Sequence, residues 1–174
     1  MTSKQMAETV YIGLGSNLGD RRRFLEEAIE RIEQIDGLEV VGLSGVYLTQ
    51  PQNMEPGSPP FYNQVARVEY AHSPVELLQK LEEVEQGLGR TDKGKNQSRS
   101  IDLDILLFGR LVVETADLSI PHPRLSERPF MLVPILDIDP SLTHPADGSL
   151  LSESMTEKQK NEILLVEDNV AREV

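Results

Sequence analysis

The sequence has no cysteine and no tryptophan among its 174 residues. Without cysteine, the chain can form no disulfide and no cysteine-ligated zinc or iron–sulfur centre, which favours a reducing compartment. The N-terminal residues lack the apolar run of a signal peptide, and no stretch approaches the roughly 20 apolar residues of a membrane span. We therefore expect a soluble, cytoplasmic protein with no membrane partner.

Positive charge is also scarce, because 17 Lys and Arg residues face 29 Asp and Glu residues, for a formal net charge of −12. Broad, non-specific binding to nucleic acid needs a basic face that neutralises phosphates. We therefore expect no nucleic-acid partner. Any phosphate chemistry must be local and assisted by a metal ion.

Strands and helices alternate along the chain, and this order predicts a single α+β domain over residues 9–151. Helix caps are expected at Asp20 and Ser73. Loops are expected at residues 50–60 and 90–98, and the polar, acidic tail at 152–174 is expected to be a loose helix or disordered. Predicted strands cover residues 10–14, 61–70 and 100–109, with one more within 110–120, and residues 38–49 are rich in Val and Leu. Predicted helices cover residues 21–35, 74 to 87 or 89, and about 130–136.

Two aspartates in the segment "RSIDLDILLF" are the strongest sign of chemistry. Side chains alternate along a strand, so Asp102 and Asp104 share one face about 7 Å apart, with Leu103 and Ile105 on the other. Two carboxylates that face the same way repel unless a positive charge lies between them. They could clamp one or two Mg²⁺ ions against phosphate oxygens. The alternative is a solvent-facing edge strand.

Cationic and aromatic side chains near the loops have two interpretations each. His122, with Arg124 and Arg128 nearby, could anchor phosphates or could be an ordinary surface or core residue. Phe61, Tyr62 and Phe130 could belong to the core or stack on a flat heterocycle.

Two glycine-containing segments fail as nucleotide motifs. "GLGSNLG" (13–19) has Leu18 where a dinucleotide fingerprint needs glycine, so it is interpreted as a Gly-rich turn that could place Asn17 beside a ligand. "GRTDKGKN" (89–96) follows a helix and ends in Asn96, so it is not a Walker loop. With Arg90, Lys93, Lys95 and Arg99 outnumbering Asp92, it is a solvated basic loop or a flap over polyphosphate.

Four segments in this order resemble one family: "YIGLGSNLGD", the "GR" before the basic loop, "RSIDLDILLFG" and "IPHPRLSERPFMLVPILDIDP". The family is 6-hydroxymethyl-7,8-dihydropterin pyrophosphokinase of the folate pathway, and the resemblance covers about residues 9–148. It implies a ferredoxin-like α+β fold with a mostly antiparallel sheet. It also implies transfer of pyrophosphate from ATP, the co-substrate, to the pterin hydroxymethyl group, with release of AMP.

The resemblance further implies the residues that handle the triphosphate. Asp102 and Asp104 would bind two Mg²⁺ ions. The groups expected to hold phosphate oxygens are Arg90, Arg99, His122 and Arg128. The residues expected to contact ATP are Glu85, Leu103, Ile105, Ser119 and His122.

On the pterin side, the resemblance implies that Phe61 and Phe130 enclose the ring and that Asn63 hydrogen-bonds its polar edge. Thr49 and Gln50 would offer backbone groups. The sequence departs from the family at Asp92, where a second arginine is usual, at the missing tryptophan, and at Pro123, where a tyrosine is common. These departures bear on the loop's contacts with phosphate and on the contacts with the nucleotide base, where differences from the family are expected, but not on the carboxylate pair.

Two other function classes stay open at this point. A ferredoxin-like module could bind a ligand without turnover, and a Mg²⁺-dependent phosphohydrolase could use the aspartate pair. The chain is expected to be a monomer, and a weak association with other folate-pathway enzymes stays open.

Overall fold

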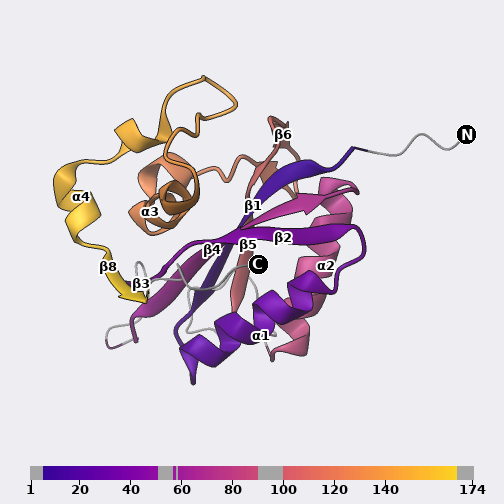
Figure 1. Cartoon of the computed structure of the whole chain (residues 1–174), viewed down its shortest axis with the longest axis horizontal. Helices are drawn as coiled ribbons and strands as arrows, with labels where there is room; N and C mark the ends of the chain where they lie inside the picture. Colours follow the sequence, from indigo (N-terminus) through magenta and orange to yellow (C-terminus); the bar gives the residue numbers. More distant parts are fainter. Residues whose placement is uncertain (1–5, 51–56, 58, 90–99, 168–174) are drawn as a thin grey trace, which may run out of the picture.

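A computed structural model describes residues 6–50, 57, 59–89 and 100–167. The fold is α+β: helices α1 and α2 cover one face of an antiparallel sheet, and α3 covers part of the other face (Figure 1). Within the described ranges, no helix is both long enough and apolar enough to cross a membrane.

The main sheet has six strands in the order β5-β1-β4-β3-β8, and β2 also pairs with β4. Every pairing in it is antiparallel. The strands are β1 (Glu8–Ser16), β2 (Leu38–Leu43), β3 (Val46–Thr49), β4 (Phe61–Tyr70), β5 (Asp102–Phe108) and β8 (Leu164–Glu167).

Two strand predictions need correction. The first strand was expected over 10–14, but β1 continues to Ser16 and carries its glycines inside the sheet. One strand was expected within 110–120, but the chain forms two short strands, β6 (Val113–Glu114) and β7 (Ser119–Ile120), which pair with each other. The Val- and Leu-rich residues 38–49 form two strands, β2 and β3, which both pair with β4. Between them, Ser44 N donates to Val65 O (2.9 Å), so the chain continues along β4.

Both predicted helix caps are confirmed. Asp20 accepts a hydrogen bond from Arg23 N (3.2 Å) at the start of α1 (Arg21–Glu33). Ser73 accepts one from Glu76 N (3.2 Å) at the start of α2 (Pro74–Gly87). Such caps satisfy N–H groups that have no partner inside the helix.

Helix α1 ends two residues before the predicted boundary. Gly37 follows with a φ of 76°, a conformation that glycine adopts without a steric penalty. The chain therefore turns out of α1 directly into β2.

Apolar residues form one core on each face of the sheet. The larger core lies between the sheet and helices α1 and α2, and includes Ile12, Leu81 and Leu103. The smaller core lies beneath α3 (Pro129–Ile138), and includes Val65 and Leu106. Burial of these side chains supplies most of the driving force for folding.

Helix α3 is fixed to the sheet by a polar contact as well as by apolar packing. One oxygen of Asp137 accepts hydrogen bonds from the Tyr47 hydroxyl (2.5 Å) and from Gly45 N (3.3 Å). Both donors lie on or beside β3. Pro121 and Pro123 flank His122, where the chain forms no helix, and one 3₁₀ turn (η1, Leu125–Glu127) follows before α3.

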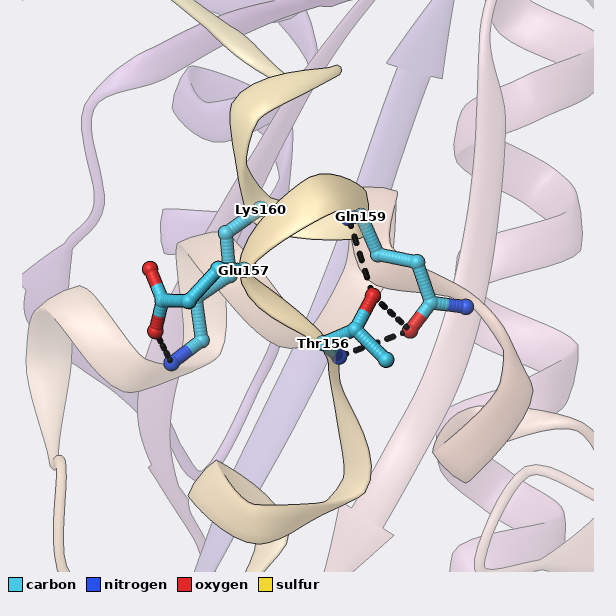
Figure 2. A network of polar contacts seen from close by, with 4 residues as sticks. All are labelled: Thr156, Glu157, Gln159 and Lys160. Carbon is cyan, nitrogen blue, oxygen red and sulfur yellow. Dashed lines mark hydrogen bonds and ion pairs between the residues drawn. The ribbon is translucent and has the colours of Figure 1, made fainter.

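The C-terminal tail contains short elements rather than one loose helix. A 3₁₀ turn (η2, Leu151–Ser154) precedes the five-residue helix α4 (Glu157–Asn161), which is followed by β8. In Figure 2, the Thr156 hydroxyl accepts from Gln159 N (3.2 Å), while Gln159 Oε1 accepts from Thr156 N (2.9 Å). This reciprocal capping box, together with the Lys160–Glu157 ion pair (3.3 Å), supports a helix too short to persist alone.

The fold predicts a large penalty for truncating Leu106. This side chain is fully buried in the core beneath α3 and lies against Gly13, so Leu106→Ala leaves a cavity that glycine cannot fill. We expect a loss of about 2–5 kcal/mol in the free energy of unfolding.

Urea denaturation measures this loss. Leu111→Ala is the matched control, because Leu111 is 41% exposed, and its effect should stay within about 0.5 kcal/mol. Equal losses in the two variants would contradict the assignment of the second core.

Candidate functional site

The aspartate pair lies near the start of β5, on the face of the sheet that α3 covers only in part. Leu103 is fully buried and Ile105 is 6% exposed, both in the core beneath α1 and α2. Asp102 and Asp104 alternate with them and are half-buried. The sequence-based expectation that the two carboxylates share one face is confirmed.

Pairing between strands places the aspartates beside two glycines of β1. Asp104 pairs with Gly13, which pairs with Val65, a residue of the core beneath α3. Asp102 pairs with Gly15, which pairs with Asn63. Because directly paired residues share a face, Asp102 and Asn63 flank Gly15, a strand position without a side chain.

The space above Gly15 is bounded by two side chains of β4. A Cβ atom at this position would lie 3.0 Å from Asn63 Oδ1 and 3.5 Å from Phe61 Cδ1. The Asn63 amide is itself held, because its Nδ2 donates to Thr49 Oγ1 (2.5 Å). Phe61 is half-buried, and Gln50, which directly follows Thr49, is exposed.

Arg128 introduces positive charge beside the carboxylates. Burial lowers the pKa of this guanidinium, as does nearby Arg124, whereas Asp104 and Asp102 raise it. An arginine remains protonated at neutral pH despite such shifts, so the group is a half-buried cation within electrostatic reach of both aspartates. Its guanidinium carbon also lies 5.6 Å from the centre of the Phe130 ring.

His122 is fixed by the backbone that follows β7. Its N–H donates to Leu106 O (3.0 Å), and its Nδ1 accepts from Arg124 N (3.3 Å). These bonds tie His122 to β5 and orient the ring so that Nδ1 faces its own chain. Ser119 lies in β7, half-buried, and β7 packs against β5.

Glu85 belongs to the interior of the protein. This residue of α2 is 3% exposed, and its Oε2 accepts from Leu103 N (2.9 Å). The side chains of Leu103 and Ile105 lie on the face opposite the aspartates. Only their backbone groups could therefore meet a ligand that lies over Asp102 and Asp104.

Side chains of the turn after β1 and the start of α1 donate hydrogen bonds to the chain that leads into β4. No sequence pattern indicated that Arg21 makes such a contact. Asn17 Nδ2 donates to Pro59 O (3.2 Å), and Arg21 donates to Pro60 O (2.8 Å). The Arg21 guanidinium also lies 4.0 Å from the centre of the Tyr62 ring. Tyr62 packs against the core beneath α1 and α2, away from Phe61.

Some predicted site residues cannot be placed. Arg90 and Arg99 lie outside the described residues, as do Lys93, Lys95 and Asp92. In the part of the chain that the structure describes, no group of three or more His, Cys, Asp or Glu side chains could hold a metal ion. A cation at the aspartate pair would therefore need further oxygen ligands from water or from a bound substrate.

Comparison with known families and proteins gives a consistent result. The model of the family 7,8-dihydro-6-hydroxymethylpterin-pyrophosphokinase (HPPK) matches residues 11–140. The chain is 41% identical over 137 residues to the 2-amino-4-hydroxy-6-hydroxymethyldihydropteridine pyrophosphokinase of Aquifex aeolicus, covering 79% of this chain and 84% of that protein. It is 43% identical over 141 residues to the folic acid synthesis protein fol1 of Pneumocystis carinii, but spans only 19% of that longer protein while 81% of this chain is covered.

Among solved structures, a triple mutant of Plasmodium falciparum HPPK-DHPS superposes with a TM-score of 0.71. The superposition covers 93% of this chain and 48% of that chain, at 15% sequence identity. At such low identity, the similarity shows the fold alone.

Gly15→Ala should disturb the site more than alanine at another strand glycine. The new methyl group would meet Asn63 Oδ1 at 3.0 Å, and that amide is already bonded to Thr49. We expect a loss of about 1–3 kcal/mol in the free energy of unfolding, measured by urea denaturation.

Gly42→Ala is the matched control, since its methyl group would meet only ordinary contacts at 3.7 Å. Its loss should be below about 1 kcal/mol. If the control lost as much as Gly15→Ala, crowding by Asn63 would not be the cause.

Proposed function

This chain belongs to the 7,8-dihydro-6-hydroxymethylpterin-pyrophosphokinase family, and from that premise we propose that it transfers pyrophosphate from ATP to 6-hydroxymethyl-7,8-dihydropterin in folate biosynthesis. AMP leaves as the second product. The observation that carries the proposal is the row Asp102–Gly15–Asn63 across β5, β1 and β4. It sets a metal-binding carboxylate and a hydrogen-bonding amide on either side of an open strand position.

The aspartate pair fits Mg²⁺ in the presence of nucleotide. This ion prefers oxygen ligands and is commonly held by one or two carboxylates together with water and substrate phosphates. Asp102 and Asp104 would supply those carboxylates, for two ions. Bound Mg²⁺ would neutralise charge on the phosphates during transfer.

The cations near the pair would hold the phosphate chain. Arg128 is half-buried beside both aspartates, and its fork of N–H groups suits phosphate oxygens. His122 lies on the segment bonded to β5. Arg90 and Arg99 complete the proposed set. Phosphoryl-type transfer depends mainly on positioning and charge stabilisation, so fixed cations supply much of what the reaction needs.

The pterin would lie over the Gly15 side of the row. Phe61 borders this space and Phe130 begins the helix beside Arg128, so the two rings could enclose a flat heterocycle. Asn63 would bond the polar edge of the ring, with backbone groups of Thr49 and Gln50. The hydroxymethyl group would then point along the row toward Asp102 and the phosphates.

The remaining ATP contacts would come from the strand edge. Ser119 is half-buried in β7, and Ile105 would contribute its backbone. We further propose a ferredoxin-like topology, which the succession β1-α1-β2-β4-α2-β5 and the neighbouring order β5-β1-β4-β2 support.

We also propose that residues 9–151 form the pterin pyrophosphokinase domain, because the family match at 11–140 lies inside this range. Residues 152–174 form the C-terminal tail, and β8 within this tail adds a strand to the main sheet. All of the residues assigned to the site belong to one chain. We propose that the chain acts as a monomer.

One assay tests the function and separates it from the alternatives. Purified protein is incubated with ATP, Mg²⁺ and hydroxymethyldihydropterin, and the nucleotide products are resolved by chromatography. AMP that forms only when the pterin is present supports the proposal. Release of ADP or phosphate without pterin would indicate a phosphohydrolase, and binding without any turnover would indicate a ligand-binding module.

Asp102→Ala and Asp104→Ala should each lower kcat by at least about a hundredfold, because each removes a proposed Mg²⁺ ligand. The metal-free variants should stay folded, since each relieves like-charge repulsion while losing some attraction to Arg128. Steady-state kinetics and thermal unfolding measure the two effects. Asp117→Ala, which changes an exposed aspartate, should leave kcat unchanged.

A further inference from the structure

Glu85 presents a carboxylate in a mostly apolar part of the interior. It is 3% exposed, and its neighbours on α2 include the buried Leu81 and Val84. A carboxylate in such surroundings is costly unless hydrogen bonds satisfy it. The bond from Leu103 N to Glu85 Oε2 (2.9 Å) is one that does so, so its geometry is tightly specified.

That hydrogen bond supplies an acceptor to a backbone N–H at the edge of the sheet. β5 is an edge strand, with β1 as its neighbour on one side. Every second N–H of such a strand points away from the neighbouring strand and needs an acceptor from elsewhere. Helix α2 packs against β5 and supplies this acceptor at Leu103 through Glu85.

Leu103 lies between the two aspartates, so fixing its peptide also constrains theirs. The Glu85 bond holds the strand from its edge, while the buried Leu103 side chain holds it from the core. If Glu85 were lost, β5 could shift along its open edge and change the spacing of the carboxylates.

The same bond joins the two ends of the basic segment. Glu85 lies near the end of α2, and Leu103 lies near the start of β5, 18 residues later. Residues 90–99, which carry Arg90 and Arg99, connect these elements. The bond therefore holds together the end of α2 and the start of β5, the elements that precede and follow those residues.

We propose that Glu85 is a positioning residue: its buried carboxylate holds β5 at Leu103 so that Asp102 and Asp104 keep the spacing that Mg²⁺ binding requires. The inference deepens the proposed function, and its catalytic part rests on that function. It assigns Glu85 an action through the protein backbone in place of the direct ATP contact that the family resemblance implies.

Three variants and two controls test the proposal. Glu85→Leu removes the acceptor, Glu85→Asp keeps the charge but shortens its reach, and Glu85→Gln keeps an acceptor oxygen at the same reach without the charge. Glu83 lies on the exposed side of the same helix, with a side chain 65% exposed, so Glu83→Leu and Glu83→Gln are the matched controls.

The first measurement is amide hydrogen exchange at Leu103 by NMR, without metal or nucleotide. Exchange, corrected for any change in global stability, should accelerate at least about tenfold in Glu85→Leu and Glu85→Asp. It should stay within about threefold of the unchanged protein in Glu85→Gln and in both controls. Unaltered exchange in Glu85→Leu and Glu85→Asp would overturn the proposal, whatever reaction the protein catalyses.

The second measurement is turnover as a function of Mg²⁺ concentration. Glu85→Leu should lower kcat at least about tenfold and raise the Mg²⁺ concentration needed for half-maximal rate, while the Kd of metal-free ATP stays unchanged. Glu85→Gln should recover most of the rate. A rate as low in Glu85→Gln as in Glu85→Leu, with Leu103 still protected, would overturn the proposal, because the charge would then act on substrate directly.

The two measurements test the proposed function and the role of Glu85 separately. If the unchanged protein formed no AMP from ATP and pterin, the proposed function would fail, yet exchange at Leu103 would still decide whether Glu85 holds β5. If Glu85→Leu did not fold, Glu85→Asp and Glu85→Gln would still provide the comparison.

Discussion

Two like charges held on one face of a strand are the constraint on which the proposed site depends. Asp102 and Asp104 cannot turn apart by rotating β5, because rotation would bring the buried Leu103 and Ile105 into water. Burial of two such side chains is worth several kcal/mol, on the order of 1.5–3 kcal/mol each, which exceeds the repulsion between two half-solvated carboxylates. The strand therefore favours positive charge beside the pair, and the half-buried Arg128 lies within electrostatic reach of both aspartates.

The division of one sheet face into an apolar half and a polar half explains why the site lies where it does. Along β1, Tyr11 lies beneath α3 in the second core, whereas Gly15 lies beyond it beside Asp102 and Asn63. Tyr47 spans the boundary, since it pairs with Asn63 and bonds Asp137 of α3. The contact that fixes the covering helix thus begins at the row of residues that forms the site.

Local patterns were sufficient to predict the elements whose signals are short-range. Asp20 and Ser73 cap helices as expected, and the alternation in "DLDIL" predicted the shared face of the aspartates. The extension of β1 past Leu14, through Gly15, was not predictable, because glycine is unfavourable in strands unless neighbours need its space. The neighbour at Gly15, Asn63, lies far along the chain. The pairing of β8 with β3 likewise depends on partners more than 100 residues apart.

A site that binds a polyphosphate needs several charged side chains close together and a rigid backbone beneath them. In a small protein these two requirements conflict. Here the frame is supplied from the opposite face: the core beneath α1 and α2 anchors Leu103, and Glu85 satisfies its N–H from the same side. The exposed face is thereby left for groups that interact with solvent and ligand, including the half-buried Arg128. Because side chains alternate along β5, one strand can meet both requirements at adjacent residues. The buried Leu103 therefore lies next to the aspartates proposed as metal ligands because of strand geometry. A helix could not place such residues so close together on opposite faces of one element.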